Sequence, residues 1–154
     1  MDGGTEITGS FTMDKIKVNA YENLLAISLV CEITPEILAK VFSLLDGKPI
    51  YGVSTGRSSL TVFTSPEKMR ETIRELHSLE NVKAISCRKG IAMIEVLHPS
   101  FISSPGWVAR ISGALSSRGI NIIEVTTSKA SINIFIDEDK LKYAVKALGD
   151  VVEA

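Results

Sequence analysis

Residues that build metal centres and disulfide frameworks are scarce in this chain. Its 154 residues include only two cysteines and two histidines, and none of them has a partner at the spacing of a metal site. Cys31 and Cys87 are interpreted as reduced thiols, because the polar, acidic segment 1–14 does not resemble a secretory signal. The sequence therefore predicts no disulfide, no bound metal and no cofactor.

An excess of charge of one sign is missing as well, and so is a long hydrophobic run. The 17 Lys and Arg residues face 18 Asp and Glu residues, which leaves a formal net charge of −1. Proteins that bind nucleic acid or an anionic membrane surface usually carry a clear basic excess. No apolar run approaches the roughly 20 residues that span a bilayer. We therefore expect a cytoplasmic globular protein that has neither nucleic acid nor a membrane as its partner.

Hydrophobic residues are plentiful, and their spacing repeats between the two halves of the chain. They make up 45% of the sequence, which is enough for a packed core. The pattern predicts strand, turn, strand, helix, strand, strand and helix, first at 15–80 and again at 81–154. In the first half, the predicted elements are strands Lys15–Ala20 and Leu24–Val30 around a turn at 21–23, a helix opened by Thr34-Pro35 and closed by Gly47, strands Pro49–Ser54 and Ser59–Thr64, and a helix that starts at Ser65-Pro66. In the second half, they are strands Val82–Cys87 and Ile91–Leu97 around a turn at 88–90, a helix between Ser104 and Gly119, strands 119–125 and 131–137, and a helix that contains Leu141, Val145 and Leu148.

The repeat predicts an α+β protein of two tandem ferredoxin-like units, 15–80 and 81–154. Each unit is expected to form a four-stranded antiparallel sheet with two helices on one face, in the order βαββαβ or a permutation of it. Residues 1–14 carry little hydrophobic periodicity and are expected to be a flexible lead-in. Two connectivities stay open: either each unit closes on itself, or the first unit takes Val82–Cys87 and the second takes Ile16–Ala20.

The helix that follows Ser103 has the sequence features of a ligand-binding helix start. Ser104 stands where an N-cap belongs, and Pro105 stands at the first helical position. Gly106 follows in the first turn, where the missing Cβ leaves backbone N–H groups open to a close approach. A small ligand could place its carboxylate on these N–H groups. The alternative is a capped helix that only packs on the sheet.

Four segments of the chain resemble one protein family. The segments are SPGWVARISGALSSRGINIIEV at 104–125, TTSKASINIFIDEDKLKYAVKAL at 126–148, ITGSFTMDKIKV at 7–18 and VKAISCRKGIAMIEV at 82–96. They are similar to the tandem ACT domains that form the regulatory region at the carboxyl end of aspartate kinases. The kinase catalytic half and a phosphate-binding loop are missing from the sequence, so the resemblance implies a chain that is not an enzyme.

The resemblance also implies an assembly and a ligand. In this family, the sheets of two ACT units join side by side, and small effectors, usually amino acids, bind where the loop before the first helix meets a partner unit. A homodimer or higher oligomer is expected, and a separate kinase catalytic chain is a further possible partner. The implied ligand-binding residues are Ser104, Pro105, Gly106, Trp107, Val108, Ala109, Asn121, Ile122, Ile123, Thr126, Thr127 and Ser128. Backbone N–H groups of 106–109 would hold the carboxylate of the effector, and Asn121 or nearby carbonyls its ammonium group.

Departures from the family pattern narrow the choice of ligand. Lysine-responsive relatives tend to carry acidic residues near Ile123 and at Lys129, so a cationic ligand would lack its counter-charges here. In the first unit, Glu36 stands at the helix start and would repel an anionic group.

Two other functions stay open. One is a structural subunit that dimerises a kinase chain without a ligand of its own, and the other is a small enzyme that uses a pair such as Cys31 and His98.

Overall fold

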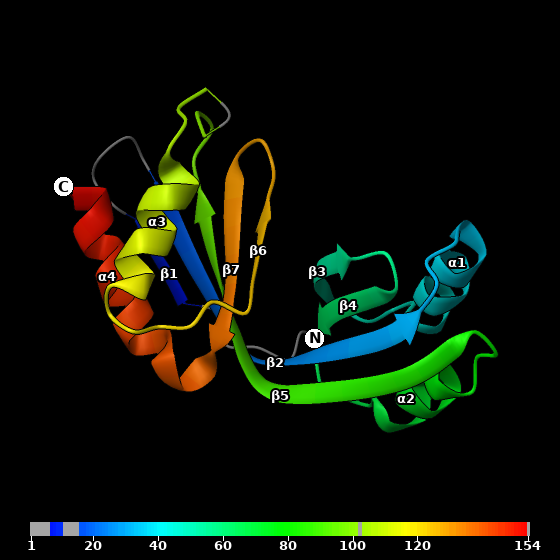
Figure 1. The fold of residues 1–154 in the computed structure, drawn as a ribbon. Coiled ribbons are helices and arrows are strands. Elements are labelled where there is room, and N and C mark those ends of the chain that lie inside the picture. Colours follow the sequence, from blue (N-terminus) through cyan, green and yellow to red (C-terminus); the bar gives the residue numbers. More distant parts are fainter. Residues whose placement is uncertain (1–6, 11–15, 102, 154) are drawn as a thin grey trace. The chain divides into compact units, whose positions relative to one another are not determined.

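The computed structural model describes residues 7–10, 16–101 and 103–153, which group into two compact units (Figure 1). The elements are β1 (Ile7–Ser10), β2 (Lys17–Cys31), α1 (Pro35–Leu44), β3 (Ile50–Thr55), β4 (Ser59–Thr64), α2 (Arg70–His77), β5 (Val82–Leu97), α3 (Trp107–Ser116), β6 (Glu124–Thr127), β7 (Ser131–Asp137) and α4 (Leu141–Glu153). None of the described helices combines the length and the hydrophobicity of a bilayer-spanning segment.

The first unit comprises residues 23–89 and has the ferredoxin-like order βαββαβ. Its strands lie in the order β3, β4, β2 and β5, with residues 23–31 of β2 as its first strand and residues 82–89 of β5 as its fourth. β4 pairs antiparallel with β3 on one side and with β2 on the other. Side chains from the sheet and from both helices, α1 and α2, share one core. Its buried members are Leu25, Ile27, Leu29, Cys31, Ile37, Val41, Leu45, Leu60, Val62, Met69, Leu76 and Val82.

The second unit uses the same arrangement in a permuted chain order. Its strands lie in the order β2, β5, β7 and β6, and β1 pairs antiparallel with residues 17–20 of β2. The fourth strand of the ferredoxin-like order is therefore supplied by residues 17–22, which precede all other elements of this unit except β1. Its buried core contains Ile16, Val18, Ala20, Ala92, Ile94, Val96, Phe101, Ile111, Leu115, Ile120, Ile132, Ile134, Ile136, Leu141, Ala144, Ala147 and Leu148.

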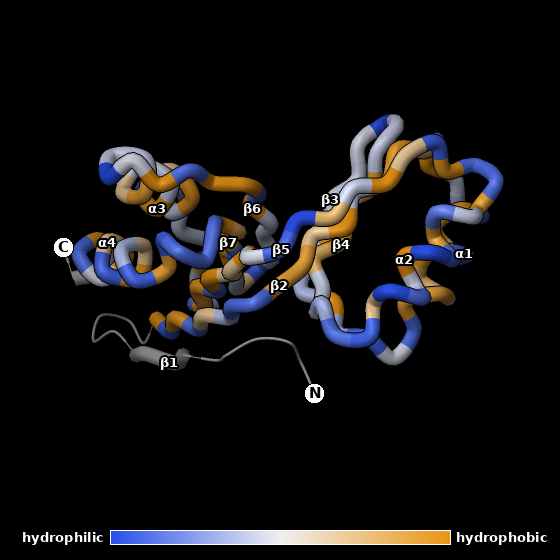
Figure 2. The backbone as a smooth tube through the Cα atoms, turned by 90° about the horizontal axis from the view of Figure 1, so that it is seen from below, coloured by the Kyte–Doolittle hydropathy of each residue, from blue (hydrophilic) through white to orange (hydrophobic). Residues whose placement is uncertain are grey.

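The predicted α+β class and ferredoxin-like units are confirmed. Figure 2 shows hydrophobic stretches along β4 and β7. In the ferredoxin-like order βαββαβ, β4 is the third strand of the first unit and β7 is the third strand of the second unit. The phenylalanines that the repeat places in equivalent positions, Phe63 of β4 and Phe135 of β7, are both fully buried. The residues that face the helices of their own unit are Leu60 and Val62 of β4 and Ile132, Ile134 and Ile136 of β7. Because the side chains of a strand alternate between its two faces, Phe63 and Phe135 lie on the opposite face of each sheet.

Both predicted hairpins are wrong, because β2 and β5 each run straight through the predicted turn. Asn23 and Gly90 adopt left-handed φ angles of 61° and 72° inside these strands. Asn and Gly tolerate this conformation, which is why they also signal turns. Here each half of the strand is held by a different partner. Residues 25–30 of β2 pair with β4, and residues 17–20 pair with β1.

The compact units consequently have other boundaries than the sequence repeat at 15–80 and 81–154. Residues 16–22 pack in the core of the second unit, and Val82 packs in the core of the first. Of the two connectivities that the sequence left open, the structure has the one in which the leading strands are exchanged. Of the predicted flexible lead-in at 1–14, only Ile7–Ser10 is described, and it forms β1.

Two helix starts in the first unit differ in how well the sequence predicts them. α1 begins at Pro35 as expected, and the hydroxyl of its N-cap Thr34 accepts a hydrogen bond of 3.2 Å from the Ile37 N–H. α2 begins only at Arg70 rather than at Ser65-Pro66. The Ser65 hydroxyl instead accepts a hydrogen bond from the Glu67 N–H in a local turn, and the left-handed Lys68 (φ 53°) interrupts a helix at this point.

Candidate ligand-binding site

The site is built around the start of α3, and its N-cap is Gly106 rather than Ser104. Gly106 has a φ of 100°, and no side chain caps the helix. Ser104 and Pro105 lie in the turn before the helix, so their predicted positions as N-cap and first helical residue are wrong. A Cβ on Gly106 would meet no atom within 4 Å, so glycine is required by the left-handed backbone and not by lack of space. The Gly106 carbonyl accepts the first helical hydrogen bond, from the Arg110 N–H at 3.0 Å.

The residues before the helix form a run of tight turns. The His98 N–H donates to the Ala130 carbonyl at 2.8 Å, which ties the end of β5 to the loop before β7. The Phe101 N–H then donates to the His98 carbonyl, and the Ser103 N–H donates to the Ser100 carbonyl. These bonds bring the loop after β5 next to the turn between β6 and β7.

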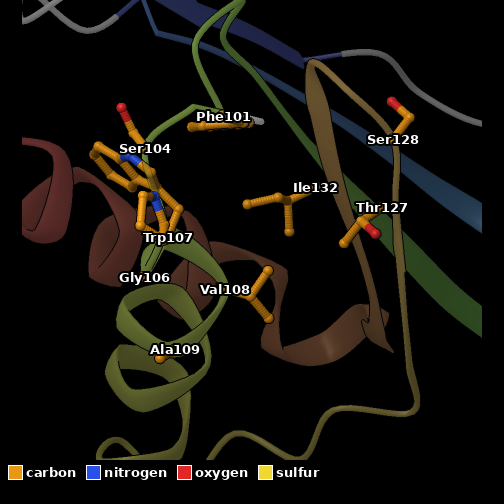
Figure 3. A pocket seen from close by; sticks show the side chains of 10 residues that line it. Phe101, Ser104, Gly106, Trp107, Val108, Ala109, Thr127, Ser128 and Ile132 are labelled. Atoms are coloured by element: carbon orange, nitrogen blue, oxygen red, sulfur yellow. The ribbon is translucent and has the colours of Figure 1, made fainter.

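A cavity of about 560 Å³ opens between the helix start and the β6–β7 turn (Figure 3). It is lined by Phe101, Ser104, Pro105, Gly106, Trp107, Val108, Ala109, Thr127, Ser128 and Ile132. Figure 3 shows Trp107 of α3 and Thr127 of β6 on opposite sides, with the side chain of Ile132 between them. The hydroxyl groups of Ser104 and Ser128 lie at two edges of the cavity.

Aromatic packing forms one wall of the cavity. The rings of Phe101 and Trp107 lie 5.5 Å apart between centroids, tilted by 48°, and the ring of His98 lies 5.6 Å from that of Phe101. The Arg110 guanidinium lies 4.4 Å from the centre of the Trp107 ring, as in cation–π pairs. Its Nη2 also donates to the Val151 carbonyl of α4 at 3.3 Å. The Trp107 side chain is thus held in place from two directions.

The electrostatic character of the cavity comes from the backbone. None of its lining residues carries a charged side chain. The first N–H groups of a helix have no intrahelical acceptor, and the helix dipole places partial positive charge there. Because Gly106 supplies no side-chain cap, the start of α3 can accept an anionic group of a ligand. The apolar side chains can cover the remainder of such a ligand.

The structure brings together part of the predicted site. Residues Ser104 to Ala109, Thr127 and Ser128 line the cavity, whereas Asn121, Ile122, Ile123 and Thr126 do not. Asn121 is exposed, the Ile123 N–H donates to the Phe135 carbonyl at 2.8 Å, and the Thr126 hydroxyl accepts from Asn133 Nδ2 at 3.2 Å. Direct ligand contact by the residues at 121–123 and by Thr126 therefore stays a prediction.

Sequence reasoning missed two lining residues, Phe101 and Ile132. Phe101 is 9% exposed, and its aromatic side chain in the loop at 99–106 was the available signal. Ile132 is 3% exposed and belongs to the alternating pattern of β7, which assigns it to the core without indicating a cavity.

The described residues offer little for metal or nucleophile chemistry. No group of three His, Cys, Asp or Glu side chains that could hold a metal ion occurs among them. Cys31 belongs to the core of the first unit, where burial raises the pKa of its thiol and favours the neutral form. His98 belongs to the second unit, and its Nδ1 accepts a hydrogen bond of 3.1 Å from the Ser100 N–H. Neither observation supports the alternative of a catalytic pair of Cys31 and His98.

Comparison with known proteins supports the resemblance seen in the sequence. Residues 86–150 match the family model of the ACT domain. An aspartokinase of Bacillus sp. (strain MGA3) is 26% identical over 99 residues, which cover 62% of this chain and 24% of that protein. This chain thus spans about a quarter of the length of the curated relative that it matches.

Solved structures of aspartate kinases and of their regulatory subunits share the fold. The regulatory subunit of aspartate kinase from Thermus thermophilus, in a ligand-free form, has a TM-score of 0.78 at 23% identity and covers 87% of this chain and 95% of that one. Aspartate kinase from Clostridium acetobutylicum, described as an allosteric enzyme, has a TM-score of 0.81 at 17% identity and covers 88% of this chain and 34% of that one. At these identities, the likeness establishes the fold alone.

Proposed function

We propose that this protein is a non-catalytic regulatory module that binds an amino acid, or a similar small metabolite, at the start of α3. The observation that carries the proposal is the cavity of about 560 Å³ beside a helix start that no side chain caps. The carboxylate of the effector binds the N–H groups at the start of α3, as anions do at helix N-termini in general. The hydroxyls of Ser104, Thr127 and Ser128 supply further polar contacts at the rim.

The lining favours an effector whose side chain is uncharged. Phe101, Trp107, Val108 and Ile132 provide aromatic and aliphatic surface, and no carboxylate lines the cavity. A lysine-like side chain would place its ammonium group beside these apolar side chains without a counter-charge, which costs binding free energy. An amino acid with an aliphatic or hydroxyl side chain fits this lining better.

Regulation follows from linkage between effector binding and assembly. An effector shifts a conformational equilibrium only by its differential affinity for the two states. We place the site at the interface with a further ACT unit, in a cytoplasmic homodimer or higher oligomer. The Thermus thermophilus regulatory subunit, almost all of which this chain matches, supports a function beside a separate aspartate kinase catalytic chain.

A structural role without an effector is the second candidate, and exposed apolar residues favour it. Ile50 and Val53 of the first unit are 40% and 37% exposed on β3, the edge strand of its sheet. Exposed apolar side chains that are grouped on a sheet are typical of a surface that pairs with another subunit. In that case, the module would dimerise a kinase chain and bind no ligand. The double variant Ile50→Lys/Val53→Lys would then change the mass measured by light scattering, whereas no amino acid would change the melting temperature.

The test of the effector site is a thermal-shift screen of all twenty amino acids with the full chain. An effector at 100 times its dissociation constant adds about 2.7 kcal/mol to the free energy of unfolding. Since 1 kcal/mol shifts the Tm of a chain of this size by about 2–4 °C, this corresponds to a rise of roughly 5–11 °C. We expect the rise for an amino acid with an uncharged side chain and none for lysine.

The variant Ala109→Glu locates the binding site. Ala109 is the exposed third residue of α3, where a carboxylate interacts favourably with the helix dipole, so the chain stays folded. The same carboxylate repels that of the effector, so the rise in Tm should disappear. Ala109→Gln has nearly the same size without the charge and should keep most of the rise. An unchanged rise in Ala109→Glu would exclude binding at this helix start, and the absence of any rise in the unmodified chain would favour the structural role.

A further inference from the structure

We propose that the first unit carries a second binding site, for an acidic amino acid, in a cavity at the end of β2. This cavity of about 350 Å³ is separate from the one at α3, and its lining belongs entirely to residues 23–89. It is lined by Val30, Cys31, Glu32, Arg57, Ser58 and Lys83.

The cavity lies at the same end of the sheet as the cavity of the second unit, but no residue of α1 lines it. In both units, the loop after the first strand approaches the turn between the second and third strands. In the first unit, the Cys31 N–H donates to the Ser58 carbonyl at 3.1 Å and fixes this approach. The Gly56 N–H donates to the Ser59 carbonyl at 2.9 Å and closes the turn that carries Arg57. The backbone around the cavity is therefore well defined.

Charged side chains set this cavity apart from the cavity of the second unit. Arg57 comes from the β3–β4 turn, Lys83 from β5, and Glu32 from the loop after β2. None of these three side chains takes part in the ion pairs of Glu71 with Arg74 and of Asp150 with Arg118. The three charges at the cavity thus stay available to a ligand.

The charge pattern matches one class of small molecule. Two cations and one carboxylate complement a ligand that has two carboxylates and one ammonium group, which is the charge pattern of an acidic α-amino acid. Arg57 and Lys83 would each bind a carboxylate, and Arg is suited to bind it through two parallel hydrogen bonds. Glu32 would bind the ammonium group. Val30, which is 45% exposed, would cover the carbon chain.

Isothermal titration calorimetry of the full chain at low ionic strength tests the proposal, since screening by salt weakens exposed charge pairs. L-aspartate and L-glutamate are titrated, with succinate as a dicarboxylate that lacks the ammonium group and L-lysine as a ligand of the opposite charge. We expect saturable binding of at least one acidic amino acid, weaker binding of succinate and none of L-lysine at this site.

Variants assign the binding to this cavity. Arg57→Ala and Lys83→Ala should each weaken binding about tenfold, as loss of a charge-assisted hydrogen bond does. Glu32→Gln should weaken binding of the amino acid but not that of succinate. Arg70→Ala removes an exposed arginine of the same unit away from the cavity and should bind like the unmodified chain. All four side chains are exposed, so the Tm without ligand should stay unchanged.

Three outcomes would overturn the proposal: no saturable binding of either acidic amino acid, equal affinity for succinate and L-aspartate, or a loss of affinity in Arg70→Ala as large as that in Arg57→Ala. The variant Ala109→Glu distinguishes binding at this cavity from binding at the cavity beside α3. Acidic amino acids should bind to that variant with unchanged affinity even if the site at α3 does not exist.

Discussion

The two units have the same fold but start their first helices in opposite ways. In the first unit, the Thr34 hydroxyl caps α1, Pro35 occupies the first helical position, and Glu36 adds a carboxylate to the first turn. In the second unit, the left-handed Gly106 precedes α3, no side chain caps the helix, and the first turn contains no acidic residue. The first helix start is satisfied by its own side chains, whereas the second is left open to a ligand.

The cavities of the two units differ in the charge of their linings. The cavity of the second unit has no charged lining residue and combines backbone N–H groups with aromatic and aliphatic walls. The cavity of the first unit is lined by two basic residues and one acidic residue. A duplicated fold can therefore keep its core while the loops at one end of each sheet acquire different binding chemistry.

Core truncation should affect both units to a similar degree. Leu45 and Leu115 occupy equivalent positions of the repeat and are 2% and 0% exposed. Replacing either with Ala should lower the free energy of unfolding by about 2–5 kcal/mol. Because β2 and β5 contribute to both units, we expect one cooperative transition in urea for each variant. Fluorescence and circular dichroism should give the same midpoint, and two separate transitions would show that the units unfold independently.

Gly106→Ala should destabilise the second unit through its backbone alone. A side chain at a φ of 100° is strained, which costs about 1–3 kcal/mol, although the added Cβ meets no neighbour. Gly113 in the middle of α3 is the matched control, since its Cβ also has free space but its backbone is helical. Gly113→Ala should stabilise the protein by up to about 1 kcal/mol. A similar fall in Tm for both variants would contradict this account of Gly106.

Removal of a hydroxyl should distinguish the two helix starts directly. Thr34→Ala loses the hydrogen bond to the Ile37 N–H and should cost about 1 kcal/mol in the free energy of unfolding. Ser104→Ala removes no cap of α3 and should change the free energy of unfolding by less than about 0.5 kcal/mol. Urea denaturation measures both values, and a larger loss for Ser104→Ala would mean that Ser104 caps α3 in solution.

The ion pairs should give the smallest difference between the units. In the second unit, Arg118 Nη2 and Asp150 Oδ2 lie 2.6 Å apart, and the two side chains are 42% and 57% exposed. In the first unit, Arg74 Nη1 and Glu71 Oε2 lie 3.6 Å apart, and the two side chains are 70% and 73% exposed. Double-mutant cycles should give a coupling free energy below about 1 kcal/mol for Arg118 with Asp150 and close to zero for Glu71 with Arg74. Coupling of both pairs should fall further in 1 M salt, and a stronger coupling between Glu71 and Arg74 would reverse this ranking.

Much of the fold could be predicted because its signals are local. The start of α1 follows from the capping preference of Thr34-Pro35, and the bounds of β4 follow from its hydrophobic alternation. The start of α3 was predicted two residues too early, because Ser-Pro suits either a helix start or a preceding turn. In the site, the loop and helix residues from Ser104 to Ala109 were predicted. Phe101 and Ile132 were missed, because their contribution depends on how β7 and the loop pack together.

The amino-acid sequence by itself determined the duplication, the α+β class and the resemblance to ACT domains, since all three depend on hydrophobic spacing and short motifs. Only the tertiary structure decided that Asn23 and Gly90 lie inside continuous strands and that the leading strands are exchanged between the units. The physical reason is that a left-handed φ is a preference of one residue and is compatible with a turn or a strand. The choice between them is made by the strands that pair on each side and by the side chains that become buried there.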